Sequence, residues 1–472
     1  MPLNAVQVAG RHPRHFPTAR VRLSPVARRS MAVMIGFFLT VNALLAFEDR
    51  GSTPQSGGIT DGVQTETARL KQEGLEAARE VSQAYPQEPL ALALLGSAHY
   101  NVGQSREAIQ ELKRCLEMKA EQVEPNEILA RIAYEKGELE ESVRFARAAL
   151  KHGPATAELL NRLGRAELDL GRPQEAAQTL QQATGLPRPG SESHYLLGQA
   201  YLQSGDYLRA QQSFRQAIEL MADHTQAYFG LFTATLRLGQ VEQAEKYREQ
   251  FKKLEVSDRR ALADRADSGE GSSGLPLVRR TVARTLYGAA QLHRAGRATE
   301  RAMALLRRAA LLDPDNPTYR GALEALFLQP SSFPQGLKAF QAMVEQQPES
   351  PWNHLFLGRF QARLEDFESA EKSYLKVQEL APERAEGFRV LADLYYRQGR
   401  KLAEAETLAR RAVELDPSGT QYHLLALICL KKQDRAGALQ AVRQAVARSP
   451  GEQKYQQLLK SLEAAPSPRN QP

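Results

Sequence analysis

Residues 195–217, YLLGQAYLQSGDYLRAQQSFRQA, contain the pattern that decides the fold of this chain. Apolar side chains recur every three or four positions both before and after Gly205, which is the spacing of a helix with one buried face. Glycine adopts the left-handed backbone conformation easily, so Gly205 can end one helix and reverse the chain into the next. Gly198 and Ala210 are small where the two helices would cross. The stretch therefore predicts an antiparallel helical hairpin.

The hairpin pattern recurs along the first half of the chain with a period of 34 residues. The turn register comprises Gly103, Gly137, Gly171, Gly205 and Gly239. A register of small residues five positions later comprises Ala108, Ser142, Ala176, Ala210 and Ala244. A third register, upstream of the turn, comprises Gly96, Ala130, Gly164, Gly198 and Phe232. Because each hairpin can bury only one face within itself, the repeats must stack on one another.

This pattern resembles the tetratricopeptide repeat family, in which Leu-Gly-x2-Tyr is followed by Ala-x3-Phe. The corresponding residues here are Leu197, Gly198, Tyr201, Ala210 and Phe214. The resemblance extends over roughly residues 64–464. It implies an all-α fold, a right-handed α-α superhelix in which the first helices of successive repeats line a concave groove. In the family such a groove holds an extended peptide or a partner helix.

The second half repeats the theme less regularly, and Pro330 and Pro334 interrupt one repeat. A segment rich in Gly and Ser separates the halves, and we interpret it as a linker between two arrays that can still touch. A loop on one continuous superhelix is the alternative. The predicted parts are a basic leader (1–30), an apolar segment (31–47), a flexible spacer (48–63), a first array of a half-unit plus five repeats (64–254), a linker (255–276), a second array of about five repeats (277–451), a cap helix (452–464) and a disordered tail (465–472).

The N-terminal segment has the composition of a membrane anchor or a targeting signal. Residues 1–30 contain six arginines and no acidic residue, and residues 31–47 run for 17 positions without a charge. Arginine before the apolar stretch predicts that the N-terminus stays inside and the body lies on the non-cytoplasmic side. An uncleaved transmembrane helix at 31–47 is our first interpretation. A cleaved export signal and an organellar transit peptide are the alternatives.

The net charge of +7 is concentrated at the N-terminus and does not predict binding to nucleic acid. Seven arginines against Glu48 and Asp49 give residues 1–50 a charge of +5, so the remaining chain is nearly neutral. The sequence predicts no catalytic residue, no metal site, no cofactor and no small-molecule substrate. The nine histidines lack metal-ligand spacing, and the fingerprint-like glycines at 269–274 lack the preceding strand that dinucleotide binding needs.

The second half offers one candidate binding surface. Arg363, Arg397 and Lys431 are spaced 34 apart on successive first helices, so they should line the groove together. Helical spacing places four further residues near them, namely Trp352, Arg359, Arg389 and Tyr396. A basic groove with aromatic walls would bind an acidic, extended protein segment. An ordinary solvated helical face is the alternative interpretation.

The first half offers a second candidate surface, which is mixed in charge and becomes apolar toward its end. Its residues are Glu127, Arg131, Asn161, Arg165, Tyr195 and Phe229. This surface would suit a less acidic ligand. The family's chaperone-binding members grip a C-terminal carboxylate with cationic and amide side chains. Among the corresponding positions here only Arg162 is cationic, so no such clamp is predicted.

These observations predict a non-enzymatic scaffold or adaptor of the cell envelope that binds protein segments in its grooves. One alternative is an organellar adaptor, with the leader acting as a transit peptide. A further alternative is a substrate-recruiting subunit of an enzyme complex.

Overall fold

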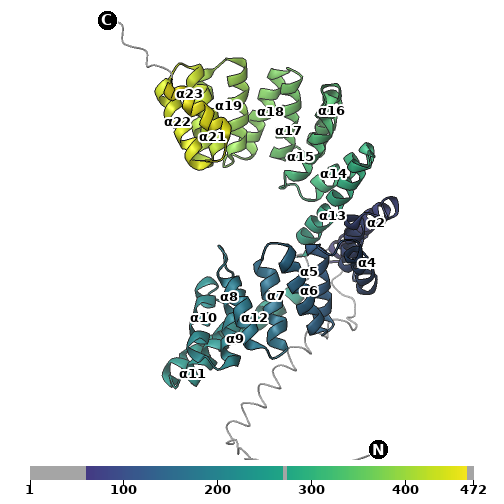
Figure 1. Ribbon diagram of the computed structural model, residues 1–472, viewed down its shortest axis with the longest axis vertical. Coiled ribbons are helices and arrows are strands. Elements are labelled where there is room, and N and C mark those ends of the chain that lie inside the picture. Colours follow the sequence, from purple (N-terminus) through teal and green to yellow (C-terminus); the bar gives the residue numbers. More distant parts are fainter. Residues whose placement is uncertain (1–59, 269–273, 465–472) are drawn as a thin grey trace, which may run out of the picture. The chain divides into compact units, whose positions relative to one another are not determined.

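The computed structural model describes residues 60–268 and 274–464. Within these ranges the chain forms 22 α-helices, two short 3-10 helices and no strand (Figure 1). The predicted leader, the apolar segment at 31–47, most of the spacer and the tail at 465–472 lie outside the described residues. No helix in the described ranges has both the length and the apolar composition needed to cross a membrane.

Two groups of helices follow each other along the chain. The first group is α2 (Thr60–Ala84), α3 (Pro89–Asn101), α4 (Ser105–Met118), α5 (Val123–Glu135), α6 (Leu139–His152), α7 (Ala157–Asp169), α8 (Pro173–Thr184), α9 (Ser191–Ser204), α10 (Tyr207–Leu220), α11 (Thr225–Arg237) and α12 (Val241–Ser268). The second group is α13 (Leu275–Ala295), α14 (Thr299–Leu312), α15 (Thr318–Glu324), η2 (Ala325–Phe327), η3 (Pro330–Ser332), α16 (Phe333–Gln346), α17 (Pro351–Arg363), α18 (Phe367–Leu380), α19 (Ala385–Gln398), α20 (Leu402–Leu415), α21 (Gly419–Lys431), α22 (Arg435–Arg448) and α23 (Gln453–Ala464).

Helices adjacent in the chain pack as hairpins, and within each of the two series a hairpin packs against the next (Figure 1). From α3 to α12 there are five such hairpins, and α13 to α22 form the second series. The last helix, α23, packs on α22 at the end of that series. The predicted all-helical solenoid of stacked hairpins is confirmed.

The turns between paired helices have the backbone conformation that the glycine register predicts. All five glycines of the first half have positive φ, between 71° and 83°. The register continues in the second half at Glu365, Gly399 and Gln433, which also have positive φ. Two of these three are not glycine, although a left-handed conformation costs other residues about 1–2 kcal/mol. The turn geometry therefore persists where the sequence no longer favours it.

The helix crossings explain the register upstream of the turn, which includes Gly164 and Gly198. A Cβ added at Gly198 would lie 2.6 Å from Cε1 of Phe214, and one at Gly164 would lie 2.5 Å from Cγ of Leu180. Real Cβ atoms do not approach other carbons this closely, so even alanine would force the facing side chain or its helix to shift. The prediction that small residues mark helix crossings is confirmed.

The predicted linker at 255–276 is largely helical, which corrects the sequence interpretation. Helix α12 continues to Ser268 and α13 begins at Leu275. Residues 241–268 contain neither glycine nor proline, so nothing in the sequence ends the helix earlier. The degenerate repeat has a first helix of only seven residues, α15, followed by two 3-10 turns next to Pro330 and Pro334.

Helix α2 joins the two arrays, an arrangement that the sequence does not predict. Its buried apolar residues belong to the same core as α13 and the rest of the second array, together with Ala91, Leu94, Leu95 and Ala98 of α3. The remaining buried side chains of the first array form cores of their own. Leu94 of α3 packs at Gly288 of α13, and Val282 of α13 packs at Gly74 of α2.

Ion pairs also join α2 to the second array. Three glutamates of α2, spaced seven residues apart, each bind an arginine of α13 or α14. The pairs are Glu66 with Arg279, Glu73 with Arg308, and Glu80 with Arg301. The half-unit that the sequence assigns to the first array therefore packs equally on the second.

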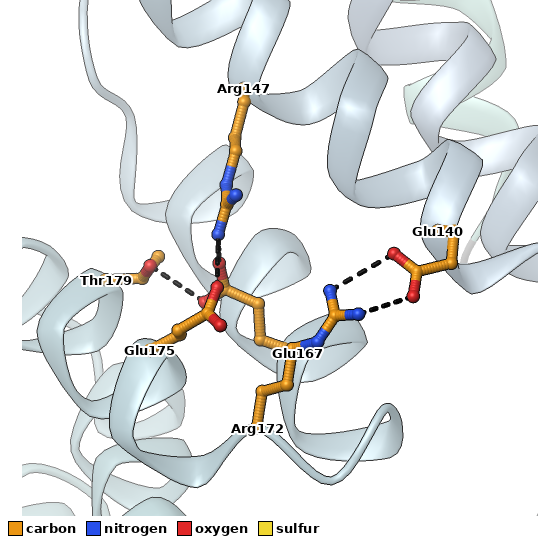
Figure 2. A network of polar contacts seen from close by, with 6 residues as sticks. All are labelled: Glu140, Arg147, Glu167, Arg172, Glu175 and Thr179. Carbon is orange, nitrogen blue, oxygen red and sulfur yellow. Dashed lines mark hydrogen bonds and ion pairs between the residues drawn. The ribbon is translucent and has the colours of Figure 1, made fainter. Parts of the chain in front are cut away.

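Neighbouring repeats of the first array are joined by a polar network between α6, α7 and α8 (Figure 2). Its centre is Glu167, which is fully buried and accepts hydrogen bonds from Arg147 and from Thr179, both at 2.8 Å. Arg147 also binds Glu175 at 2.7 Å. A second, exposed pair joins Arg172 to Glu140. The buried carboxylate thus depends on one arginine of the preceding repeat.

Candidate functional site

The second array contains a cavity of about 340 Å³ whose lining is rich in arginine. We call it the arginine groove. Its residues are Glu324, Arg359, Ala362, Arg363, Tyr374, Arg389, Val390, Asp393, Leu394 and Arg397. Four cations and two carboxylates leave the groove with two excess positive charges.

The lining comes mainly from the first helices of successive repeats. Arg359 and Arg363 lie one turn apart on α17 and therefore share a face of that helix. Asp393 and Arg397 occupy the same two positions on α19, 34 residues later. Stacked repeats bring equivalent positions side by side, and these four side chains line the same cavity. The structure thus brings together four of the predicted residues, the arginines at 359, 363, 389 and 397.

Glu324, at the end of α15, holds two of the arginines in place. Arg359 donates to one oxygen of its carboxylate at 2.9 Å, and a guanidinium nitrogen of Arg363 lies 2.8 Å from the other oxygen. Glu324 is only 11% exposed, so these ion pairs are partly shielded from water. The two guanidinium groups also lie over the rings of Phe356 and Phe360, at 4.8 and 5.0 Å. The two arginines and one carboxylate leave this end of the groove with one positive charge in excess.

The other two arginines differ in their partners. Arg397 binds Asp393 of its own helix at 2.8 Å. Arg389 is half-buried and has no carboxylate oxygen within 4 Å among the described residues. Burial lowers the pKa of Arg389, and the positive charge of Arg359 lowers it further. Asp393 and Glu386 oppose this shift through their charges, but neither forms an ion pair with Arg389 in the described part of the chain.

Tyr374 of α18 contributes a hydroxyl to the groove. Its side chain is only 4% exposed, and its ring packs at Gly358, where an added Cβ would lie 2.5 Å from Cε1. Burial raises the pKa of Tyr374 to about 12. The hydroxyl has no hydrogen-bond partner in the described residues, although it lies among arginines.

Three other predicted residues lie outside the arginine groove. Trp352 is 9% exposed, donates its indole N–H to the carbonyl of Asp315 at 3.0 Å, and is covered by Arg384. It closes the turn between two repeats and does not line the groove. Lys431 donates to the carbonyl of Tyr396 at 2.6 Å and lies over the ring of that residue. These two form a separate contact between α19 and α21.

The surface predicted in the first array is electrostatically balanced. Arg131 lies 3.6 Å from Glu158, and Arg165 binds Glu192. Burial raises the pKa of Glu127, and the charge of Glu158 raises it further. Arg131 Nε and Asn161 Oδ1 are buried without a hydrogen-bond partner.

At the apolar end of that surface, Tyr195 and Phe229 form two separate aromatic contacts. Tyr195 accepts a hydrogen bond from Gln199 and packs on His224 at 4.9 Å. Phe229 packs on Phe251 at 5.3 Å. The four arginines of the second array line one cavity, whereas the predicted residues here contact separate neighbours.

Six lining residues of the arginine groove are absent from the prediction, and three of them, Glu324, Tyr374 and Asp393, are polar. Asp393 could have been predicted from the sequence, because it lies 34 residues after Arg359 and so occupies the equivalent position in the next repeat. Tyr374 was detectable as the aromatic residue of an Ala-x3-Tyr pair, although its role as a donor was not. Glu324 gave no signal, because the irregular repeat that contains it breaks the period.

Several solved structures resemble this chain. YrrB, described as a TPR protein with an unusual peptide-binding site, is 17% identical over 41% of this chain and 99% of its own, with a TM-score of 0.37. Yeast Tom70 is 17% identical over 81% of this chain and 96% of its own, with a TM-score of 0.35. MamA from Desulfovibrio magneticus is 18% identical over 39% of this chain and 96% of its own, with a TM-score of 0.33. A search of curated proteins finds no match.

Two family models match the sequence, and both describe the tetratricopeptide repeat. The first matches residues 94–150, 129–191, 357–420 and 389–453, and the second matches residues 201–260. Together they cover more than half of the chain, including α17 and α19, whose arginines line the groove. With its stacked hairpins and left-handed turns, the chain belongs to the tetratricopeptide repeat family.

Proposed function

We propose that the protein is an adaptor whose arginine groove binds an acidic segment of a protein partner. Proteins with this repeat are generally non-enzymatic interaction scaffolds. The observation that supports an acidic partner is the charge imbalance of the groove, which holds four arginines and two carboxylates. Arginine forms strong, directional hydrogen bonds to carboxylates, and the stacked phenylalanine rings hold two of the guanidinium groups in position.

The contrast between the two arrays supports the choice of groove. In the first array Arg131, Arg162 and Arg165 each have an acidic residue within 4 Å. An acidic ligand would have to displace these existing pairs, which cancels much of its gain. In the second array the unpaired charge of Arg389 is available without such a loss.

Binding of defined peptides tests the proposal. We suggest a short fluorescein-labelled peptide of alternating Glu and Ala, with Gln and Lys counterparts as controls, measured by fluorescence anisotropy. The Glu peptide should bind the protein, the other two should not, and added salt should weaken binding. Charge reversal by Arg363→Glu with Arg397→Glu should abolish binding at unchanged helical content. Arg165→Glu in the first array is the matched control and should leave binding intact. Equal binding of the Glu and Gln peptides would contradict the proposal.

We also propose that the repeats lie on the non-cytoplasmic side of a membrane in the cell envelope. The support is the arginine-rich, acid-free stretch at 1–30, followed by 17 uncharged residues at 31–47. Protease accessibility in fractionated cells tests this placement. Protease added outside an intact inner membrane should degrade the repeats. Degradation only after the cytoplasm is opened would reject the placement, and a mature N-terminus before Met31 would favour organellar import.

A further inference from the structure

The tyrosine of the arginine groove is unusual for its position in the repeat. Tyr374 lies four residues after the small residue at the start of a second helix, and its aromatic ring fills the crossing at Gly358. The corresponding residues of other repeats are Leu112, Ala146, Leu180, Phe214, Arg248, Leu306, Phe340, Ala409 and Val442. None of these has a hydroxyl, so packing at the crossing does not require one.

The hydroxyl of Tyr374 is available to a ligand in the groove. It makes no hydrogen bond within the described residues, and its oxygen is not among the fully enclosed polar atoms of that part of the chain. The residue is more than nine-tenths buried, yet it lines the groove and has no partner in the described residues. A ligand in the groove would supply the missing acceptor.

Arg389 lines the same cavity and also lacks an ion-pair partner among the described residues. It is half-buried, and no carboxylate oxygen of the described chain lies within 4 Å of it. Asp393, one turn away on α19, is bound by Arg397 instead. One cation and one neutral donor, both unpaired, thus face one cavity.

We infer that Tyr374 and Arg389 form a subsite for one carboxylate of the bound segment, an aspartate or glutamate side chain. This inference rests on the proposed function and adds the position at which the partner is recognised. The charges favour a carboxylate over a phosphoryl group. A phosphoryl dianion calls for two unpaired cations, whereas Arg359, Arg363 and Arg397 are each within 3 Å of a carboxylate oxygen. Arg389 with a tyrosine hydroxyl matches a single negative charge.

The subsite is tested with the full chain and the same Glu peptide. Tyr374→Phe removes only the hydroxyl and should weaken binding about tenfold, since a hydrogen bond to a charged acceptor is lost. Arg389→Gln should weaken binding by about tenfold or more, and Arg389→Lys should restore part of the affinity. Tyr396→Phe is the matched control, because Tyr396 lies on α19 but outside the groove, and its affinity should equal that of the native protein.

Thermal unfolding separates recognition from a structural role. Because the Tyr374 hydroxyl is unpaired, Tyr374→Phe should unfold at the same or a higher temperature than the native protein. A lower unfolding temperature would show that the hydroxyl supports the fold and would overturn the assignment.

The outcomes distinguish the subsite from the proposed function. If the Glu peptide binds and only the charge reversals at Arg363 and Arg397 weaken it, the groove stands and the subsite falls. Tighter binding of a phosphoserine peptide than of the Glu peptide would overturn the choice of carboxylate. If the Glu peptide does not bind the native protein at millimolar concentration, the proposed function itself fails.

Discussion

The buried carboxylate of Glu167 allows a sharp prediction about how the repeats hold together (Figure 2). Arg147, which is 52% exposed, supplies one of its two hydrogen bonds, and Thr179 supplies the other. Arg147→Ala would leave a fully buried negative charge with a single hydroxyl as its partner. Removing one partner of a buried pair costs about 3–5 kcal/mol. Because water reaches the exposed side of this pair, we expect the low end, about 3 kcal/mol.

Changing the carboxylate itself should cost less, although it is the more buried group. Glu167→Gln removes the charge while it keeps the volume and an acceptor for Thr179, so we expect a loss of about 1–2 kcal/mol. The double variant, Arg147→Ala with Glu167→Gln, should then be more stable than Arg147→Ala alone, because no buried charge remains. The matched control is Arg172→Ala. Its partner Glu140 is 64% exposed, so the loss should stay below about 1 kcal/mol.

Urea unfolding of the four variants measures these differences. Hydrogen exchange of the α7 and α8 amides gives the local counterpart, since a repeat transmits its loss of stability mainly to its neighbours. If the single costs simply add in the double variant, the two side chains act independently and the argument from the buried charge is refuted.

Three further predictions concern the turns, the crossings and α2. Glu365→Gly should stabilise the protein by about 1 kcal/mol and Gly399→Ala should destabilise it by about as much, because both residues have positive φ. Thermal unfolding measures both changes, and a loss of stability in both variants would show that φ does not decide the effect. Gly198→Ala should cost about 1–3 kcal/mol, and adding Phe214→Leu should recover part of it by removing the ring that the new methyl meets. Glu73→Lys should place a like charge against Arg308 and accelerate hydrogen exchange in α2, less so at high salt; exchange that is unchanged would show that the pair contributes nothing.

The regular half of the fold was predictable from the sequence because a stacked array imposes one geometry at equivalent positions. Five glycines at one spacing predicted five left-handed turns, and all five are observed. The second half shows the limit of that approach. Glu365 and Gln433 occupy the same turn with side chains that give no local signal. Stacking against neighbours, and not the residue itself, fixes their conformation.

The candidate site was predictable in part for the same reason. A spacing of 34 brought Arg363 and Arg397 to one groove. Helical spacing also placed Trp352 near them, but spacing cannot tell the groove side of a helix from the side that a turn between repeats covers. Trp352 lies against the turn at Asp315, between α14 and α15. Glu324 was not predicted, because α15 is short and its residues do not follow the 34-residue spacing.

Helix α2 shows why contacts between the arrays could not be predicted from the sequence. Periodic spacing relates each repeat to the next one along the chain, whereas α2 packs against α13, roughly two hundred residues later. The contact combines a shared apolar core with three ion pairs whose glutamates are spaced seven residues apart. Such spacing keeps the glutamates on one face of the helix, toward the second array, while the connection to α3 remains short. Disturbing α2 should therefore affect both arrays, whereas a change at α11, which packs on α9, α10 and α12, should affect mainly the first array.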